Sequence, residues 1–540
     1  MDGLFGQERW RAPRERAGRV LDGPWSRSAL AALAGALPAL AFPAPSLWWL
    51  APVALVPWML LARGAPTARR AGWDGWCGGL GFMLAVHHWL LPSLHVFTVV
   101  IAGLLGLLWV PWGLLVRRLL GGQPGGTRAL AALLVLPSAW LMVELVRSWQ
   151  ALGGPWGLLG SSQWQVPPAL RLASWGGVWL VSLCVVAVNT AVALLVSARD
   201  ARTPAVAGLV AVVALTSGAW FWAPRAQSSG GARVAVVQPG VISGADARFA
   251  RAERLTRTLA GQGVDLVVWG ESSVGHDLTG RPDLADRLAA LSRRVGADVL
   301  VNVDARGSAG GTGPGTPPGI RKSSVLVGPD GPKGARYDKM RLVPFGEYVP
   351  ARSLLGWATS VGKAAGEDRV RGTRQVVMEV RGGLRIGPLV CFESAFPDMG
   401  RRLTESGAGL LVAQSATSSF QGSWAPSQHA SLAALRAAES GRPVVHATLT
   451  GVSAVYGPDG ARAGPWLGTD ASAARVYDVP LATGTTPYVR FGDWPVVMAL
   501  LVLGGHGAGA AARRVSRRSA PRPPGPPART VHGSPARPAR

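Results

Sequence analysis

Residues 387–397 read Gly-Pro-Leu-Val-Cys-Phe-Glu-Ser-Ala-Phe-Pro. The apolar run before the cysteine is typical of a short buried strand, and Pro397 suits the first turn of a helix that follows it. Cys391 therefore lies between a strand and a helix, where the helix dipole and nearby cations lower the pKa of a thiol and favour a nucleophile. On its own, Cys391 is equally well interpreted as a small buried hydrophobic residue, which is the commonest fate of a free cysteine.

Similar β-rich runs recur on both sides of this stretch, and helical patterns lie between several of them. The predicted strands are 233–238, 265–269, 298–303, 323–327, 384–391, 410–414, 443–448 and 453–456. The predicted helices are 246–260, 283–295 and 427–439. Alternating strands and helices indicate an α/β domain over residues 232–485.

The first half of the chain consists instead of long uncharged runs separated by short arginine clusters. A transmembrane helix needs about 20 mainly apolar residues, and the run 28–62, broken at Phe42-Pro43-Ala44-Pro45, suits two short spans. The other candidate spans are 75–94, 96–116, 129–143, 172–197, 203–224 and 494–512. The sequence therefore predicts a multi-pass α-helical membrane domain of about eight spans, seven of them in residues 28–224.

The composition fits a membrane protein better than a nucleic-acid-binding one. The net charge is +25 and the chain is 48% hydrophobic, yet only 16% of its residues are charged, against about 25% in soluble proteins. So basic a chain first suggests nucleic-acid binding. The three cysteines, Cys77, Cys184 and Cys391, are too few for a disulfide scaffold, and the first two lie inside apolar spans, where we interpret them as buried hydrophobic residues.

The positions of the arginines explain the charge and predict an orientation. If the Arg-rich residues 1–27 are cytoplasmic, 22 of the 55 basic residues fall in inside loops and tails. The short outside loops between the first seven spans then hold only Arg147 and Arg171. By the positive-inside rule this arrangement places residues 232–485, with 22 of the 30 acidic residues, on the outer face of the membrane.

The two ends of the chain leave alternatives open. Residues 513–540 are rich in arginine and proline and are predicted to be a disordered cytoplasmic tail near anionic headgroups. A nucleic-acid arm is the alternative, but no aromatic residues are interleaved to stack bases. At the start, a cleaved signal peptide ending near Ala39-Leu40-Ala41 competes with the first span, although that apolar run continues straight into a second span.

Two further residues have the chemistry to assist a cysteine nucleophile. Lys339 is one of only four lysines, against 51 arginines, so it is a candidate for a role that needs a compact charge with a movable pKa. We interpret the other three, Lys322, Lys333 and Lys363, as solvated surface residues. Glu271 follows the predicted strand 265–269, where partial desolvation raises a carboxyl pKa toward that of a general base. A turn or helix cap is the alternative for this carboxylate.

The ordered set Glu271, Lys339 and Cys391 resembles the nitrilase, or carbon–nitrogen hydrolase, superfamily, which has a Glu-Lys-Cys triad on an αββα sandwich. Three segments are also similar to bacterial apolipoprotein N-acyltransferases, namely 153–164, 337–350, and Gln428-His429 with 436–443. A nitrilase-like domain between the last two of eight spans is the layout of that family. The resemblance covers nearly all of the chain except its two arginine-rich ends.

The resemblance implies a two-step acyl transfer at a bacterial cytoplasmic membrane, with no cofactor, no metal and a monomeric enzyme. Glu271 takes the thiol proton, Cys391 attacks an ester of a phospholipid donor, and Lys339 stabilises the oxyanion. The acyl group then passes from the Cys391 thioester to the α-amine of a diacylglyceryl apolipoprotein acceptor. Glu347 and Glu393 match positions that support the family's active site.

The chain departs from the family pattern at three places. Phe392 stands after the nucleophile where a tyrosine is common, and 415–420 reads Ser-Ala-Thr-Ser-Ser-Phe where the family has Ser-Asn-Asp-Ala-Trp-Phe. No tryptophan lies in 241–250, where Phe249 is the candidate substitute. Two other functions therefore stay open, a membrane-anchored nitrilase-like amidase or hydrolase, and a degenerate membrane protein without catalysis.

Overall fold

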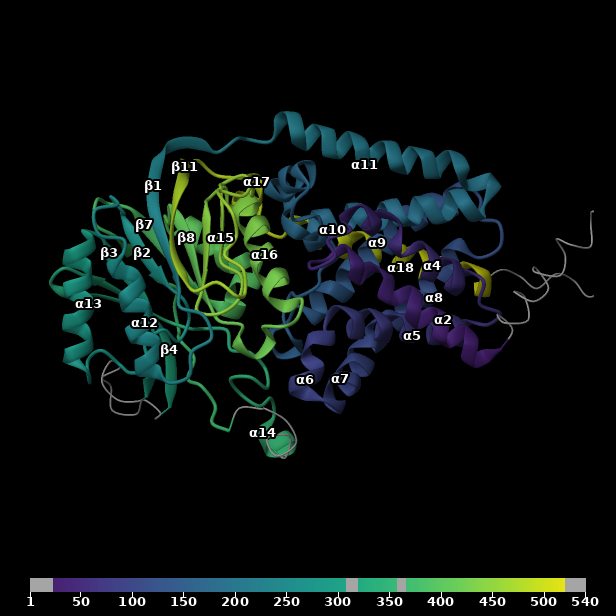
Figure 1. The fold of residues 1–540 in the computed structure, drawn as a ribbon. Coiled ribbons are helices and arrows are strands. Elements are labelled where there is room, and N and C mark those ends of the chain that lie inside the picture. The colour runs from purple at the N-terminus through teal and green to yellow at the C-terminus, as the bar shows by residue number, and fades with distance from the viewer. Residues whose placement is uncertain (1–22, 307–318, 357–365, 520–540) are drawn as a thin grey trace, which may run out of the picture.

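The computed structural model describes residues 23–306, 319–356 and 366–519. A helical half and an α/β half lie end to end, and the chain passes from one to the other through α11 (Arg202–Trp222) and β1 (Gln227–Gln238) (Figure 1). It returns to the helical half at its C-terminal end through α18 (Trp494–Ser519). This helix includes residues 513–519, which the sequence predicts as part of a disordered tail, and the remainder of that predicted tail lies outside the described residues.

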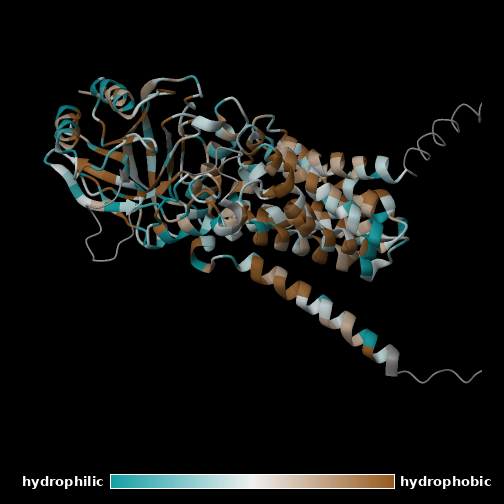
Figure 2. Ribbon diagram, turned by 90° about the horizontal axis from the view of Figure 1, so that it is seen from below, coloured by the Kyte–Doolittle hydropathy of each residue, from teal (hydrophilic) through white to brown (hydrophobic). Residues whose placement is uncertain are grey.

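The helical half contains short and long helices, and Figure 2 shows that hydrophobic residues are frequent along their ribbons. Besides α11 and α18, its α-helices are α2 (Pro24–Ala36), α3 (Ala51–Ala54), α4 (Val56–Arg63), α5 (Ala68–Val86), α6 (Leu91–Leu94), α7 (Val96–Gly106), α8 (Val110–Leu120), α9 (Gly126–Arg147) and α10 (Pro167–Ser197).

Among the described residues, five helical stretches are long and apolar enough to cross a membrane. They are Val96–Leu120, Gly126–Arg147, Pro167–Ser197, Arg199–Trp222 and Trp494–Ser516, which match five of the predicted spans. The predicted pair in 28–62 forms the shorter helix α2 and the shorter apolar segment Trp48–Arg63, and the helix in the 75–94 region ends at Val86. A multi-pass helical domain is therefore present, while the number of eight spans stays a prediction.

Arginines cap helix ends at the side of the helical half that the positive-inside rule places in the cytoplasm. Arg63 donates to the carbonyl oxygens of Leu120 at the end of α8 and Ser197 at the end of α10, at 2.9 and 3.0 Å. Last-turn carbonyls lack intrahelical donors, and a cation there also interacts favourably with the helix dipole. Arg63 therefore joins the ends of two neighbouring helices in addition to adding positive charge at this side.

Glycines allow α2 and α5 to pack at very short range. A Cβ added to Gly81 would lie 1.9 Å from the carbonyl oxygen of Ala32, and one added to Gly35 would lie 2.0 Å from that of Gly78. Small residues let helix backbones approach closely inside a membrane, where van der Waals packing rather than hydrophobic burial drives association. Next to this contact, Trp58 packs on the fully buried rings of Trp109, Trp112 and Trp140.

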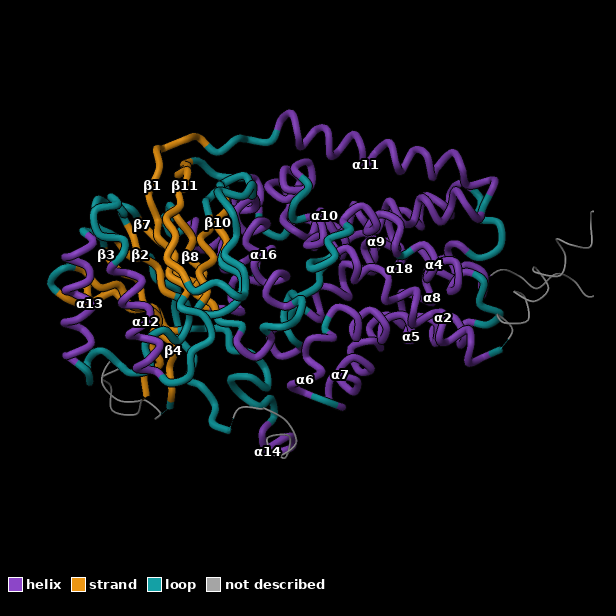
Figure 3. Tube along the Cα trace, viewed as in Figure 1, coloured by secondary structure: helices purple, strands orange, loops and turns teal. Residues whose placement is uncertain are grey.

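The α/β half is built from two sheets (Figure 3). Six strands run in the order β11-β1-β2-β3-β4-β5 and five in the order β10-β9-β8-β7-β6. After β1, the strands are β2 (Leu266–Trp269), β3 (Asp298–Arg306), β4 (Ile320–Gly328), β5 (Gly331–Asp338), β6 (Met378–Glu379), β7 (Arg385–Val390), β8 (Leu410–Ser415), β9 (Val444–Thr448), β10 (Ala454–Tyr456) and β11 (Ala473–Thr483). The helices are α12 (Ala245–Arg257), α13 (Pro282–Val295), α14 (Arg352–Leu355), α15 (Pro397–Glu405), α16 (Ala425–Ser440) and α17 (Pro487–Phe491).

Alternation along the strands explains why the sheets form a layered sandwich. In β2, Leu266 and Val268 belong to a buried cluster shared with residues of β7, β8 and β9, so they lie between the two sheets. Val267 and Trp269 belong to the cluster under α12 and α13. Successive side chains of a strand point to opposite faces, and both faces of this sheet are therefore buried. The predicted αββα sandwich is confirmed in this part of the chain.

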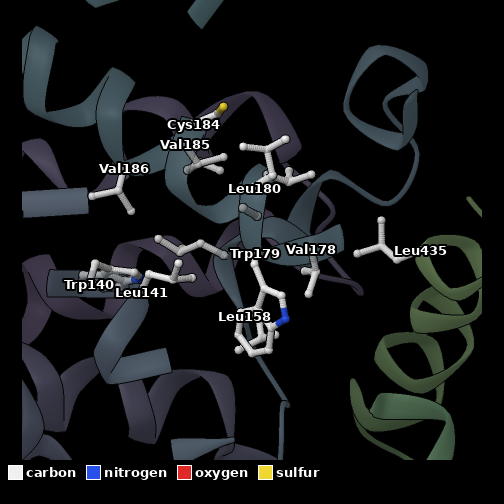
Figure 4. Close-up of a cluster of buried hydrophobic side chains, with 14 of the residues drawn as sticks. Trp140, Leu141, Leu158, Val178, Trp179, Leu180, Cys184, Val185, Val186 and Leu435 are labelled. Atoms are coloured by element: carbon white, nitrogen blue, oxygen red, sulfur yellow. The ribbon is translucent and has the colours of Figure 1, made fainter. Parts of the chain in front are cut away.

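The second sheet shares its outer core with the membrane helices. Leu411 and Ala413 of β8 belong to one continuous buried cluster that also contains α15, α16 and the helices of the first half. Figure 4 shows Leu435 of α16 beside Val178 of α10. The two halves therefore share a hydrophobic core.

A break in α10 allows a buried hydrogen bond between the α/β half and the helical half. Gly177 has a φ of +67°, and the interrupted helix leaves the N–H of Val178 to donate to Glu439 of α16 at 2.7 Å. Arg436 donates to the same carboxylate oxygen at 2.8 Å. The Tyr488 ring occupies the space where a side chain at Gly177 would lie. Buried polar groups need such partners, so this contact fixes α16 on α10.

Most predicted elements of the α/β domain are confirmed, and three strands were missed. Each predicted strand has a counterpart at nearly the same residues, as do the three predicted helices. The sequence analysis did not predict β5, β6 or β11. The structure pairs β5 with β4 and β11 with β1, both antiparallel, at the two edges of the larger sheet.

Gly81→Ala is expected to destabilise the helical half, because the new methyl group would collide with the α2 backbone, which cannot move aside as a flexible side chain can. Overpacking of this kind lowers the free energy of unfolding by about 1–3 kcal/mol. A lower midpoint of thermal unfolding in detergent would show this loss. Gly504→Ala in α18 is the matched control, since nothing lies within 4 Å of its added Cβ. Equal midpoints for the two variants would contradict the α2–α5 packing.

Candidate active site

Cys391 lies where the sequence places it, directly after β7 and at the start of the 3-10 helix Cys391–Ala395. Its φ is +51°, a left-handed conformation that is costly for a residue other than glycine. The turn is held by hydrogen bonds to the carbonyl oxygen of Cys391, which accepts from Ser394 Oγ at 2.9 Å and from His429 Nε2 of α16 at 3.1 Å. The strained backbone therefore presents the thiol at the edge of the sheet.

Glu271 enters the same region from the other sheet, two residues after the end of β2. Its N–H donates to the carbonyl oxygen of Ser415 at the end of β8, at 3.1 Å. Gly270 permits this crossing, because a Cβ there would lie 1.9 Å from the backbone nitrogen of Leu449. The carboxylate is thus brought to Cys391 by the contact between the two sheets.

Lys339 joins Glu271 to Glu347. Its Nζ atom lies 3.0 Å from Glu271 Oε1 and 2.8 Å from Glu347 Oε1, and the side chain is almost fully buried. Glu347 is itself fixed, because its Oε2 atom accepts from the N–H of Val343 at 2.8 Å. The structure therefore brings Glu271, Lys339 and Glu347 into one buried chain of charges next to Cys391.

Glu393 makes its hydrogen bonds to other groups and fixes the backbone segments next to Lys339 and Cys391. Its Oε1 atom accepts from the Tyr337 hydroxyl at 2.8 Å and from the N–H groups of Met340 and Arg341 at 2.7 and 3.0 Å. Its Oε2 atom accepts from the N–H of Val390 at 2.8 Å. One carboxylate thus connects the segment after Lys339 with the residue before Cys391.

The electrostatics define the protonation state of the site. Burial disfavours the charged form of Glu271, but the Lys322 and Lys339 ammonium groups outweigh it and lower the pKa of Glu271 to about 2. Burial, and then the Glu271 carboxylate, raise the pKa of the Cys391 thiol to about 12, against the opposing effect of Lys339. Both shifts are opposite to those expected from the sequence, a raised pKa for Glu271 and a lowered pKa for Cys391, because two ammonium groups face the carboxylate and that carboxylate lies beside the buried thiol. The resting site therefore holds a carboxylate, two ammonium groups and a neutral thiol. Such a thiol needs a base at the moment it attacks.

Lys322 corrects the sequence analysis, which interpreted it as a solvated surface residue. Its Nζ atom lies 3.3 Å from Glu271 Oε1 and donates to Ser272 Oγ at 2.6 Å. Lys333 does lie near the surface, where it pairs with Asp298, and Lys363 is outside the described residues. The rarity of lysine that singled out Lys339 applied equally to Lys322, so a usable signal was present.

A loop of the helical half packs against the turn that begins at Cys391. In segment 153–164, a Cβ on Gly154 would lie 2.5 Å from the Phe392 ring, and Trp156 Nε1 donates to Gln428 Oε1 of α16 at 2.8 Å. The Trp156 ring also lies 5.4 Å from the His429 ring, measured between centroids. The membrane half therefore forms one wall of the site.

Tryptophans at this boundary divide into two groups. Trp48 and Trp49 are exposed, as membrane anchors would be, whereas Trp156 and Trp164 are buried. Trp89 packs on both Trp156 and Phe420, with ring centroids 5.3 and 4.8 Å away. The last pair makes an aromatic contact between the helical half and the loop after β8.

The three departures from the family pattern occupy different places. Ala416, in the altered 415–420 segment, has its carbonyl oxygen 3.9 Å from Cys391 Sγ, so this loop does border the nucleophile. Phe392 packs edge-on against Phe396. Phe249 lies in the core under Arg287 and against Trp269.

Comparisons with known proteins agree with both halves of the chain. Residues 34–191 match the family model "Apolipoprotein N-acyltransferase N-terminal domain", and residues 233–483 match "Carbon-nitrogen hydrolase". A solved amidase of the nitrilase superfamily from Nesterenkonia AN1 aligns with a TM-score of 0.34 and 21% identity, covering 50% of this chain and 96% of its own.

Curated relatives match over most of their length. The Apolipoprotein N-acyltransferase of Azotobacter vinelandii is 32% identical over 92% of this chain and 97% of its own. The proteins of the same name from Geobacter metallireducens and Chromobacterium violaceum are each 30% identical over 88% of this chain, and over 94% and 92% of their own.

Glu271→Gln is expected to make Cys391 more reactive toward iodoacetamide. Burial is the first cause of the raised thiol pKa and the Glu271 carboxylate is the second, so removing this carboxylate lowers the thiol pKa and increases the thiolate fraction at pH 8, about tenfold for each pKa unit. The alkylation rate, followed on the Cys391 peptide by mass spectrometry from pH 7 to 10, checks this. Glu405→Gln on α15 is the control, and slower alkylation in Glu271→Gln would contradict the charge arrangement.

Glu393→Gln is expected to lose stability, because an amide NH₂ cannot accept from the N–H groups that both carboxylate oxygens serve. An unsatisfied buried group lowers the free energy of unfolding by about 1–3 kcal/mol. The variant should therefore show a lower midpoint of thermal unfolding and a loss of turnover. A variant as stable and active as the parent chain would show that these four contacts do not hold the turn.

Proposed function

The chain belongs to the apolipoprotein N-acyltransferase family, and on that premise we propose that it transfers a fatty acyl chain from a membrane phospholipid to an apolipoprotein. The acceptor is the α-amine of the N-terminal diacylglyceryl-cysteine, and the acyl group passes through a thioester on Cys391. The observation that supports these roles best is the buried pair of Lys339 with Glu271, at 3.0 Å, beside a neutral thiol.

In the first half-reaction, Glu271 accepts the thiol proton while sulfur forms a bond to the ester carbonyl carbon of the phospholipid. The carbonyl oxygen becomes an oxyanion, and Lys339 and the backbone N–H that follows Cys391 stabilise it. Electrostatic stabilisation of this kind is commonly the largest contribution to catalysis of acyl transfer. The C–O ester bond then breaks, Glu271 returns the proton to the leaving oxygen, and a lysophospholipid departs.

In the second half-reaction, the acceptor amine attacks the thioester carbon. Glu271 removes a proton from the amine and delivers it to the departing sulfur as the C–S bond breaks, so the products are an amide and the Cys391 thiol. Glu347 keeps Lys339 in place in both steps through its 2.8 Å contact. An amidase or hydrolase would use water in place of the amine, and the relatives that match nearly the whole chain do not favour that alternative.

The membrane half supports substrates that carry acyl chains. Extraction of an acyl chain from a bilayer costs about 0.8 kcal/mol for each CH₂ group, so catalysis at the bilayer surface avoids that cost. The wall that segment 153–164 provides beside Phe392 fits this role. The arginine bias favours a bacterial cytoplasmic membrane with the α/β domain on its outer face.

The proposal predicts a fatty acyl thioester on Cys391 when the purified chain is incubated with phospholipid and no acceptor. Mass spectrometry of the Cys391 peptide would detect the acyl mass, and hydroxylamine would remove it. Cys391→Ala abolishes the adduct, whereas Cys184→Ala, which removes a buried thiol in α10, keeps it. A bare Cys391 thiol under these conditions would reject the acyl-enzyme mechanism.

The acceptor separates the transferase from the hydrolase. Adding a diacylglyceryl lipopeptide to the trapped acyl-enzyme should consume the thioester and give a triacylated peptide. Release of free fatty acid at the same rate with and without the lipopeptide would assign the chain to the hydrolases instead.

A further inference from the structure

Lys322 is the charged residue at the site to which the mechanism above assigns no role. It lies on β4, opposite Asp304 of β3 in the antiparallel register, and its side chain is only 14% exposed. Its Nζ atom lies 3.3 Å from Glu271 Oε1 and 3.6 Å from Asp304 Oδ1, and it donates to Ser272 Oγ at 2.6 Å. A second ammonium therefore reaches the same carboxylate oxygen that Lys339 contacts.

Ser272 helps to hold this ammonium in place. Its φ is +55°, its N–H donates to Asn302 Oδ1 at 2.9 Å and its hydroxyl donates to Asp304 Oδ1 at 3.1 Å. The network therefore positions Lys322 from β3 as well as from the residue after Glu271. Such a fixed ammonium is unlike Lys333 on β5, whose partly exposed side chain pairs with Asp298 outside the site.

Groups from every surrounding element contribute to the charge around Glu271. The ammonium groups of Lys322 and Lys339 face the Glu271 carboxylate. The other titratable groups nearby are Cys391 after β7, Glu347 in the loop after β5, Asp304 on β3 and His429 on α16. Burial lowers the pKa of His429 to about 4, so His429 adds no positive charge near neutral pH. The charge that acts on Glu271 is therefore set mainly by Lys322 and Lys339.

We propose that Lys322 is a positioning residue for Glu271, which holds its Oε1 atom beside Lys339 and makes its protonated form a stronger acid in the first half-reaction. This inference rests on the proposed function. After Glu271 takes the thiol proton, the neighbouring ammonium favours return of that proton to the departing oxygen of the donor. The proton moves from sulfur to Glu271 and then to the lysophospholipid, and no other reactant is needed.

The chemistry of the two leaving groups explains why the first half-reaction depends more on Lys322. An alkoxide is a poor leaving group and needs a proton as its bond breaks, which a stronger acid supplies more readily. A thiolate, the leaving group of the second half-reaction, departs with much less assistance. Lys322 therefore suits the chain to a donor that is an oxygen ester.

Single-turnover measurements of the two half-reactions test this role. Lys322→Met should slow thioester formation from phosphatidylethanolamine vesicles about tenfold or more, with a smaller effect on aminolysis of the trapped thioester by a diacylglyceryl lipopeptide. Because an opposite charge within about 4–6 Å shifts a carboxyl pKa by 1–3 units, the acid limb of thioester formation should also move up by about 1–3 pH units. Lys322→Arg should restore both properties in large part.

Lys333→Met is the matched control, because it removes a lysine from the adjoining strand without touching the site. If Lys322→Met does not accumulate, Lys322→Gln keeps a polar partner for Ser272 and serves the same test. An equal loss in both half-reactions with an unmoved acid limb would overturn the proposal, as would rates identical to those of the parent chain. Absence of any thioester in the parent chain would instead reject the proposed function.

Discussion

The buried Lys339 ammonium is the constraint on which the rest of the site depends. Removing a charge of this kind from water costs several kcal/mol unless partners of opposite charge surround it, and Glu271 and Glu347 provide them at 3.0 and 2.8 Å. These carboxylates come from different segments, one after β2 and one in the loop after β5. The six-stranded sheet must therefore form across β2 to β5 before Lys339 is accommodated. Under the proposed mechanism, the stability of this region and the alignment of its reacting groups consequently rest on the same three charges.

The contact between the two halves combines apolar packing with a few buried hydrogen bonds. Apolar side chains of α16, α15 and β8 join the core of the membrane helices, and a few directed polar contacts fix their orientation. Glu439 accepts from Val178 where α10 is broken, and Trp156 donates to Gln428 beside the nucleophile turn. The non-directional packing holds the halves together, while the hydrogen bonds determine how they meet.

Much of the fold and the site could be predicted from sequence, because the decisive strands are short apolar runs that are followed directly by residues with reactive side chains. Both β2 and β7 show that pattern, and they carry Glu271 and Cys391. Strand β5 was missed because it reads Gly-Pro-Lys-Gly-Ala-Arg-Tyr-Asp, and such a polar edge strand forms through pairing with β4 rather than through its own pattern. Lys322 was misread for a related reason, since its position opposite Asp304 depends on the β3–β4 register. The number of spans stays a prediction, because α2 and Trp48–Arg63 are shorter than a full span and α5 ends at Val86.

The four donors gathered by Glu393 have a mechanical consequence. By holding Val390 with one oxygen and Tyr337, Met340 and Arg341 with the other, this carboxylate sets the spacing between the thiol and the ammonium entirely within the α/β half. Bilayers differ in thickness, and helices respond by tilting. Such tilting reaches the site through the wall that segment 153–164 makes with Phe392, while the Glu393 contacts oppose a change in the spacing between the thiol and the ammonium. Under the proposed function, a change in bilayer thickness is therefore expected to alter this wall more than the spacing between Cys391 and Lys339.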